Sequence, residues 1–178
     1  MHKYLVGVTA ILSLSLLGFL AAVSSAQTAP ATMPKSARNG PVKVFILAGQ
    51  SNMEGQGVAD LAGKDYNDGK GTLNFLLKDP AKAPLYSQLK DDKGQWAARE
   101  DVWVWYKPKN SPVKSGPLGL GFTVYGGKHH FGPELGFGDV MGDTLGNQVL
   151  LVKTAWGGKS LAKDFRPPSS GGEVGPYP

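Results

Sequence analysis

The sequence predicts an α/β protein built on a parallel sheet, because two apolar runs flank a helical pattern and both end in glycine-rich turns. Residues 42–48 (VKVFILA) and 148–155 (QVLLVKTA) are nearly continuous apolar runs rich in branched side chains, as in strands covered on both faces. The helical pattern spans residues 132–146. In such α/β sheets, ligands bind beyond the carboxyl ends of the strands, where both glycine turns would lie.

The N-terminus has the pattern of a secretory signal. A basic residue near the start, an apolar middle and small residues precede Gln27, and this order is typical of a cleaved signal peptide. An uncleaved membrane anchor is the alternative, but a polar linker follows instead of a basic cluster. The sequence therefore divides into a signal peptide (1–26), a linker (27–41) and one domain (42–178), and it predicts a secreted or periplasmic protein.

Composition excludes several classes of function. The 178-residue chain carries a formal net charge of +5, and its lysines are scattered among acidic residues, so the sequence predicts no nucleic-acid partner. Because it has no cysteine, disulfides, thiol nucleophiles and thiolate metal sites are excluded. Residues 157–160 (GGKS) end like a phosphate-binding loop, but Lys153 stands where that motif needs its first glycine. We therefore expect no cofactor and no metal.

The middle of the chain is less regular. Residues 52–61 are compatible with a short helical turn or a loop, and residues 62–100 read as a polar insertion with several turns. Residues 101–107 (DVWVWYK) alternate and predict a strand with one solvated face. The glycine-rich stretch 115–132 predicts a loop with a short strand over residues 122–125.

The predicted helix has a clear start. Pro133 suits its first turn, and Glu134 would lie near the positive end of the helix dipole. Only two strong central strands are recognisable, whereas a doubly wound sheet usually has about five. The sequence therefore predicts a domain that is incomplete at its C-terminus, and a minimal stand-alone fold is the alternative.

The end of the first strand carries the candidate nucleophile. In VFILAGQSNMEGQG (44–57), Ser51 follows an apolar strand at a tight turn. A serine there would present its hydroxyl at the sheet edge beside its own N–H, and acyl transfer needs that pairing of nucleophile and oxyanion donor. Gln50 and Asn52 would hold the turn or donate further hydrogen bonds. The alternative is that Ser51 is a helix N-cap.

Three segments in the same order carry a resemblance to a known family. FILAGQSNMEGQG, HFGPELGFGDVM and VLLVKTAWGGKSLAKDFRPP resemble the sialate O-acetylesterase-like branch of the SGNH hydrolases, which includes carbohydrate esterase family 6. The resemblance covers about residues 42–177. It implies a three-layer α/β/α sandwich with a flavodoxin-like parallel sheet, and metal-free removal of acetyl groups from sugars.

The resemblance also implies roles for individual residues. Ser51 matches the family nucleophile, and its N–H belongs to the oxyanion hole. Gly158, in the turn after the second strand, is the candidate for a further oxyanion donor. Glu134 matches the acid of the GPE motif and would support active-site hydrogen bonds or contact substrate, with a plain helix-start carboxylate as the alternative. Trp156, beside that glycine turn, is the aromatic residue expected at the site.

The family base is absent from this sequence. Relatives carry it late, in an Asp-x-x-His segment, whereas the histidines outside the signal here are His129 and His130. Adjacent side chains on an extended segment point opposite ways, so at most one, His130, would face the cleft, with loop histidines flanking it as the simpler interpretation. The sequence predicts an exported O-acetylesterase that is weak or inactive in these residues alone, acting on acetylated carbohydrate of the sialate or xylan type. The alternative is a non-catalytic carbohydrate-binding or vestigial module. After signal cleavage no membrane partner is expected, and the sequence does not indicate an oligomeric state.

Overall fold

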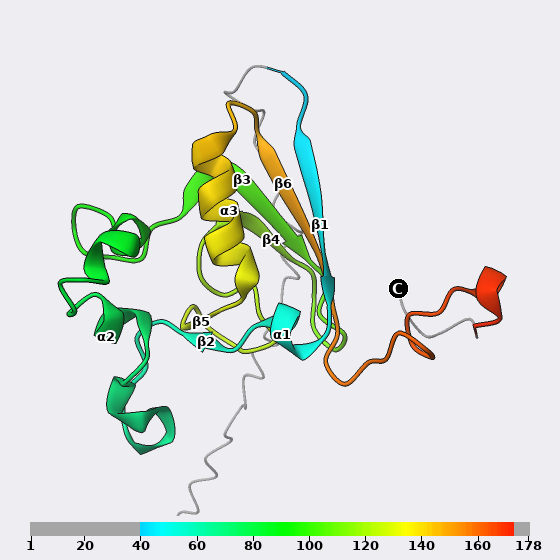
Figure 1. Cartoon of the computed structure of the whole chain (residues 1–178), viewed down its shortest axis with the longest axis horizontal. Coiled ribbons are helices and arrows are strands. Elements are labelled where there is room, and N and C mark those ends of the chain that lie inside the picture. The colour runs from blue at the N-terminus through cyan, green and yellow to red at the C-terminus, as the bar shows by residue number, and fades with distance from the viewer. Residues whose placement is uncertain (1–39, 173–178) are drawn as a thin grey trace, which may run out of the picture.

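The computed structural model describes residues 40–172, so the predicted signal peptide and most of the linker lie outside the described residues. The main sheet has four strands in the order β1-β6-β3-β4, and Figure 1 shows them side by side. The strands are β1 (Lys43–Gly49), β3 (Arg99–Tyr106), β4 (Lys114–Leu118) and β6 (Val149–Ala155). Strands β1, β6 and β3 run parallel, whereas β4 is antiparallel to β3.

The α/β class is confirmed, and the antiparallel strand is a departure from the fully parallel sheet that was expected. Only residues 107–113 connect β3 to β4, and a connection this short can join antiparallel strands but cannot form a parallel crossover. By contrast, β6 pairs in parallel with both neighbours because the long segment containing the main helix precedes it.

Smaller elements surround the sheet. Strands β2 (Gly57–Val58) and β5 (His130–Phe131) form a two-stranded antiparallel pair. The helices are α1 (Ser51–Glu54), α2 (Leu73–Leu76) and α3 (Pro133–Thr144). Four short 3₁₀ segments complete the described part: η1 (Lys64–Gly69), η2 (Ala83–Leu85), η3 (Ser87–Leu89) and η4 (Pro168–Ser170).

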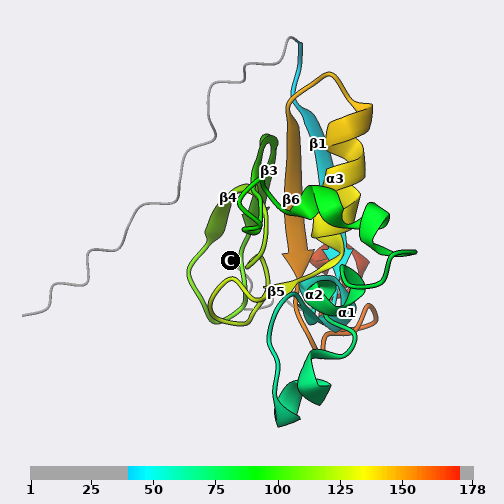
Figure 2. The same ribbon diagram turned by 90° about the vertical axis from the view of Figure 1, so that its left-hand side faces the viewer.

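Helix α3 packs on one face of the sheet, as Figure 2 shows. The rings of Phe45 and Phe137 meet edge-on with their centroids 5.2 Å apart. At Gly138 the helix approaches β4 and β6 so closely that an added Cβ would lie 2.6 Å from Leu118 and 2.9 Å from Leu151. The predicted helix is thus confirmed, and a glycine in its middle allows the close contact that forms the core.

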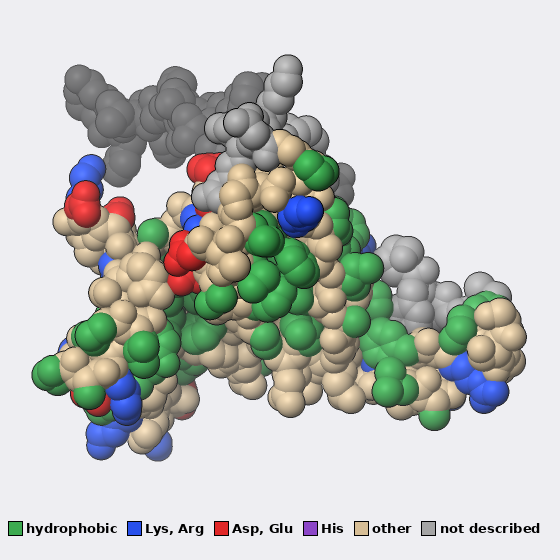
Figure 3. All heavy atoms as spheres, turned by 45° about the horizontal axis from the view of Figure 1, so that its top comes forward, with side chains coloured by type: hydrophobic (Ala, Val, Ile, Leu, Met, Phe, Trp, Pro, Cys, Tyr) green, Lys and Arg blue, Asp and Glu red, His purple; other side chains and the backbone are tan. Residues whose placement is uncertain are grey.

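The opposite face of the sheet carries apolar side chains that are exposed in the described part of the chain. Val44 and Ile46 on β1 are 54% and 71% exposed, and Trp105 on β3 is 38% exposed. Figure 3 shows that hydrophobic side chains also gather over α3 and the adjoining β1, where Val140 is 58% exposed. The described residues therefore supply the sheet and one helical layer.

The short strand expected over residues 122–125 was wrong. Lys114 Nζ donates to the carbonyls of Gly121, Thr123 and Tyr125 at 2.9, 2.6 and 3.0 Å. Lys153 Nζ donates to the intervening carbonyl of Phe122 at 2.7 Å. Ammonium groups thus satisfy the carbonyls that a neighbouring strand would otherwise pair with, and the segment needs no ladder. Between residues 40 and 172, no helix is long and apolar enough to cross a bilayer.

Candidate active site

The turns after β1 and β6 meet at one end of the sheet. The N–H of Trp156 donates to the carbonyl of Gly49 at 3.3 Å. A Cβ added at Gly157 would lie 2.6 Å from Oε2 of Glu54, the last residue of α1. The glycine therefore permits close approach of the two turns. The sequence-predicted candidate Ser51 lies between Gly49 and Glu54, and Gly158 follows Gly157.

Ser51 is the first residue of α1, and its side chain is exposed. Gln50 occupies the N-cap position without a side-chain capping bond, so the alternative interpretation of Ser51 as an N-cap is wrong. The Gln50 carbonyl accepts the N–H groups of Met53 and Glu54, both at 2.9 Å. Within residues 40–172, the N–H groups of Ser51 and Asn52 have no acceptor. A hydroxyl and two unsatisfied donors thus lie together on the surface of this turn.

A buried ion pair lies directly beneath this turn. Nζ of Lys153 is 2.6 Å from Oε2 of Glu134, and both side chains are fully buried. Lys153 also donates to the carbonyl of Glu54 at 2.9 Å. Oε1 of Glu134 accepts the N–H of Gly132 at 2.9 Å. Counting the bond to Phe122, all three ammonium protons of Lys153 are used.

The electrostatics of this pair follow from its burial. Desolvation lowers the pKa of Lys153, while the negative charge and hydrogen bond of Glu134 oppose that shift. Burial also raises the pKa of Tyr106, whose ring lies 4.9 Å from the Lys153 ammonium. Because its carboxylate is enclosed, Glu134 holds neighbouring groups in place and does not present an oxygen to solvent. A contact with substrate, one of the roles considered from the sequence, does not fit this geometry.

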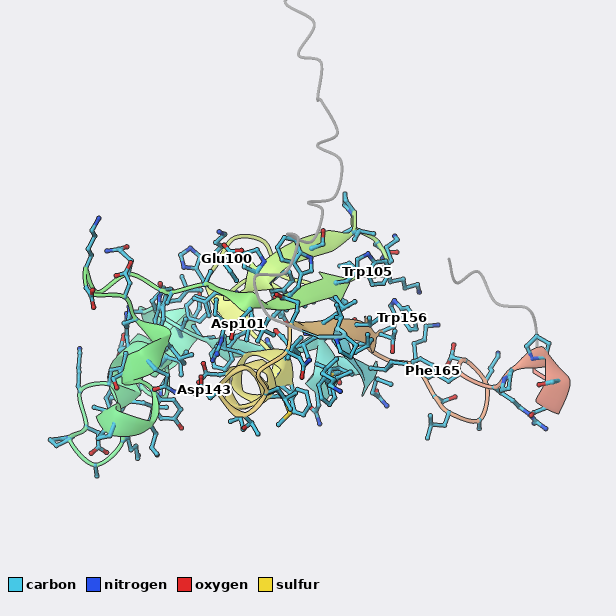
Figure 4. The ribbon with its side chains drawn as sticks, turned by 90° about the horizontal axis from the view of Figure 1, so that it is seen from above. Glu100, Asp101, Trp105, Asp143, Trp156 and Phe165 are labelled. Carbon is cyan, nitrogen blue, oxygen red and sulfur yellow. The ribbon has the colours of Figure 1, made fainter. Side chains whose placement is uncertain are left out.

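The other predicted residues of the β6 turn lie close by. Gly158 adopts φ of +70°, and an added Cβ would meet no atom within 4 Å; the glycine therefore serves a backbone conformation that other residues rarely adopt. The ring of Trp156 stacks on Phe165 with centroids 5.7 Å apart, and its Nε1 donates to the carbonyl of Lys107 at 3.1 Å. Figure 4 shows Trp156 and Phe165 together beyond the end of β6.

The two adjacent histidines differ as expected from an extended segment. His129 is half exposed, and its Nδ1 lies 2.8 Å from Oδ1 of Asp60. His130 is only 8% exposed, and its ring stacks on Tyr125 with centroids 4.6 Å apart. Burial lowers the pKa of His130, and the neighbouring His129 lowers it further.

Two hollows lie along β2, and the nearer one reaches α1 at Asn52, the residue after Ser51. The nearer one has a volume of about 350 Å³, and its lining includes Asn52, Gly55 and Gly132 but no charged side chain. The second, of about 460 Å³, is lined in part by His130. Gln56 and Gly57 line both hollows, so the two spaces adjoin along the start of β2.

Sequence reasoning missed two members of this arrangement, Lys153 and Glu54. A lysine within the apolar run VLLVKTA was the available signal, because a charged side chain on a buried strand requires a partner. The sequence did not identify that partner, since Glu134 belongs to a different element and meets Lys153 only through the tertiary packing of α3 on β6.

A comparison of the sequence with protein families gives a match. Residues 41–174 match the family described as carbohydrate esterase, sialic acid-specific acetylesterase. The chain therefore belongs to this family, which confirms the resemblance seen in the sequence, and by that resemblance it is a carboxylic ester hydrolase of the acetylesterase type that takes acetylated carbohydrate. No curated protein and no solved structure matches the chain.

Proposed function

We propose that this chain is an exported serine O-acetylesterase in which Ser51 is the nucleophile. The observation that carries the proposal is the exposed Ser51 at the end of β1, with unsatisfied backbone donors beside it and the Trp156–Gly158 turn in contact with α1. Attack on an acetyl carbonyl requires a hydroxyl and N–H donors in this relationship.

In the proposed reaction, Oγ of Ser51 attacks the acetyl carbonyl carbon and its proton passes to a base. The N–H groups of Ser51 and Gly158 stabilise the tetrahedral oxyanion. Collapse of this intermediate breaks the bond to the sugar oxygen, which takes up the proton, and leaves acetyl-Ser51. Water then hydrolyses the acetyl-enzyme to acetate and restores the hydroxyl.

The proposed mechanism requires a general base that accepts the proton of Ser51. The 178 residues contain no Asp-x-x-His segment, and a serine without a base loses most of its activation. We therefore expect slow acetate release from this chain by itself, and added imidazole should accelerate that release by acting as an external base.

Acetate release from an acetylated oligosaccharide tests the assignment. Ser51→Ala should abolish both the slow release and its acceleration by imidazole. Ser87→Ala, at an exposed serine in η3, is the matched control and should leave the rate unchanged. A Ser51→Ala protein that keeps the rate would show that another group is the nucleophile.

A non-catalytic carbohydrate-binding module is the second candidate, and the missing Asp-x-x-His segment favours it. Calorimetric titration with acetylated and deacetylated forms of the same oligosaccharide separates the two functions. A binding module should give heat with one or both forms and release no acetate under any condition. An esterase should release acetate in proportion to the protein added.

Export is proposed from residues 1–26. Expression with these residues in a bacterial host should place the protein outside the cytoplasm, and N-terminal sequencing of the exported form should read from Gln27. Retention of the intact N-terminus in the membrane fraction would indicate the alternative, an uncleaved anchor.

A further inference from the structure

The larger hollow beside β2 has no role in the proposed chemistry. Its volume is about 460 Å³, and η1, β2, β5 and the start of α2 surround it; Figure 1 shows η1 and α2 projecting beside the β2–β5 pair. Polar and aromatic side chains dominate its lining, which includes Gln56, Asp65, Tyr66, Asn67, Lys70 and His130.

One lining residue has an unsatisfied polar atom. His130 is 8% exposed, and its buried Nδ1 has no hydrogen-bond partner in the described part of the chain. Buried polar atoms are nearly always paired, so an unpaired one needs a functional or structural reason. Tyr66 and Tyr125 flank the same ring, with centroids 6.4 and 4.6 Å from it.

The backbone of η1 is left-handed where it borders the hollow. Asn67 and Asp68 have φ of 49° and 51°, and Asn67 is a lining residue. Asn and Asp adopt the left-handed region more readily than other non-glycine residues do. The turn thereby places an amide and a carboxylate side chain in succession beside the hollow, where a plain glycine turn would place none.

The chemistry of the lining selects one class of ligand. Amide side chains from Gln56 and Asn67 exchange hydrogen bonds with hydroxyl groups, and the 37% exposed ring of Tyr66 offers an apolar face for the C–H side of a sugar ring. The charged lining residues are one carboxylate, Asp65, and one ammonium, Lys70. An anionic sugar would need a positive charge in excess, and this lining provides none.

We propose that this hollow binds a neutral sugar ring of an O-acetylated oligosaccharide, next to the ring that carries the scissile acetyl group. The inference rests on the proposed esterase function and names its substrate class. Gln56 and Gly57 line both this hollow and the smaller one at Asn52. An oligosaccharide that spans both hollows would therefore bring an acetyl group to the α1 turn, where Ser51 lies.

Calorimetric titration of the whole chain tests the inference with two probes of equal length, a neutral xylo-oligosaccharide and an oligosialic acid in which every ring is anionic. The neutral probe should bind more tightly. Tyr66→Ala should weaken its binding about tenfold or more through the lost stacking surface. Lys64→Ala, in the same segment but outside the lining, is the control and should bind as the unmodified chain does.

Asn67→Gly is the most informative variant, because glycine adopts the left-handed conformation freely. We expect it to unfold at the same or a higher temperature and yet to bind the neutral probe about tenfold more weakly, because it lacks the amide. A purely structural role for Asn67 predicts unchanged affinity.

Three results would overturn the inference: no heat with the neutral probe, equal affinities for Asn67→Gly and the unmodified chain, or tighter binding of the oligosialic acid. Acetate release by Ser51→Ala is a separate measurement. It decides the proposed function and leaves the calorimetric result standing.

Discussion

Helix α3 is held by a fully buried ion pair at its start and by a partly exposed cluster along its second half. Near its start, Glu134 meets Lys153 at 2.6 Å with both side chains fully buried. Along its second half, Asp139 and Asp143 each lie 2.9 Å from Arg99, and the side chains of Arg99, Asp139 and Asp143 are 23%, 13% and 71% exposed. The buried pair lies beneath the candidate nucleophile turn, whereas the solvated cluster lies towards the opposite end of the sheet.

The difference teaches how burial changes what an ion pair contributes. Lys153 directs all its protons at fixed acceptors, including the Glu54 carbonyl of α1, so it specifies where that turn lies on the sheet. Hydrogen bonding to Asp101 is the largest contribution that raises the pKa of Arg99 further above its ordinary value, so Arg99 stays charged at every usable pH. Solvent and salt weaken partly exposed pairs such as Arg99–Asp143 more than fully buried ones.

The largest expected effect comes from breaking the buried pair. Lys153→Met should lower the free energy of unfolding by about 3–5 kcal/mol, because it leaves the Glu134 carboxylate buried without its partner. Urea denaturation measures the loss. Lys163→Met replaces an exposed lysine, serves as the control and should change the stability by less than about 0.5 kcal/mol. A loss below about 1 kcal/mol for Lys153→Met would mean that the pair is not desolvated as described.

Replacing both Lys153 and Glu134 separates the contribution of the buried pair to stability from its contribution to the position of the α1 turn. Lys153→Met with Glu134→Leu should regain at least about 1 kcal/mol relative to Lys153→Met alone, since no unpaired buried charge remains. Acetate release should nevertheless stay impaired, because nothing then anchors the Glu54 carbonyl. Full recovery of that activity in the double variant would show that the pair stabilises the fold without positioning the turn.

Much of this framework was predictable from local patterns. The runs at residues 42–48 and 148–155 became β1 and β6, and α3 begins and ends within two residues of the predicted helix. Strand β4 was missed because KSGPL contains glycine and proline, which are poor strand formers tolerated on an edge. The position of β6 between β1 and β3 is a tertiary outcome, and no local pattern encodes it.

The candidate site was also only partly predictable from the sequence. An apolar strand followed by GQSNM indicated the turn at Ser51, because local chemistry sets the end of a strand. The partner of Lys153 and the hollow beside Asn67 depend on elements that are distant in the sequence. Turns were predicted within residues 62–100, but the left-handed residues of η1 and the hollow beside it become visible only in the folded structure.

Removing Arg99 should destabilise the protein less than removing Lys153. Arg99→Met should cost about 1–2 kcal/mol, because Asp139 is largely buried and loses its partner while water still reaches the cluster. Urea denaturation with and without 1 M salt measures this cost. At 1 M salt the screening length is roughly 3 Å, so the cost of Arg99→Met should shrink. The cost of Lys153→Met should not shrink. Equal salt dependence of the two would remove the distinction between the ends.

A smaller, pH-dependent effect is expected at the site end from His130. Burial and then His129 lower its pKa, against a raising contribution from Asp60. The unfolded chain therefore binds the proton more readily, so stability should be constant above about pH 6.5 and fall as the pH drops towards the lowered pKa. His130→Phe should flatten this part of the curve in thermal denaturation. An unchanged slope would assign it to other groups.

The smallest effect should come from Asp143, the most exposed member of the Arg99 cluster. It lies in the last turn of α3, where the negative end of the helix dipole disfavours a carboxylate. Its ion pair with Arg99 is favourable, and the two effects oppose each other with magnitudes of about a few tenths of a kcal/mol each. Asp143→Asn should therefore shift the free energy of unfolding by no more than about 0.5 kcal/mol in either direction. Asp139→Asn, on the same helix but largely buried, should cost more, and urea denaturation of both variants compares them directly. If Asp143→Asn proved the costlier of the two, solvent exposure would not determine the strength of these contacts, and the contrast between the two ends of α3 would need another cause.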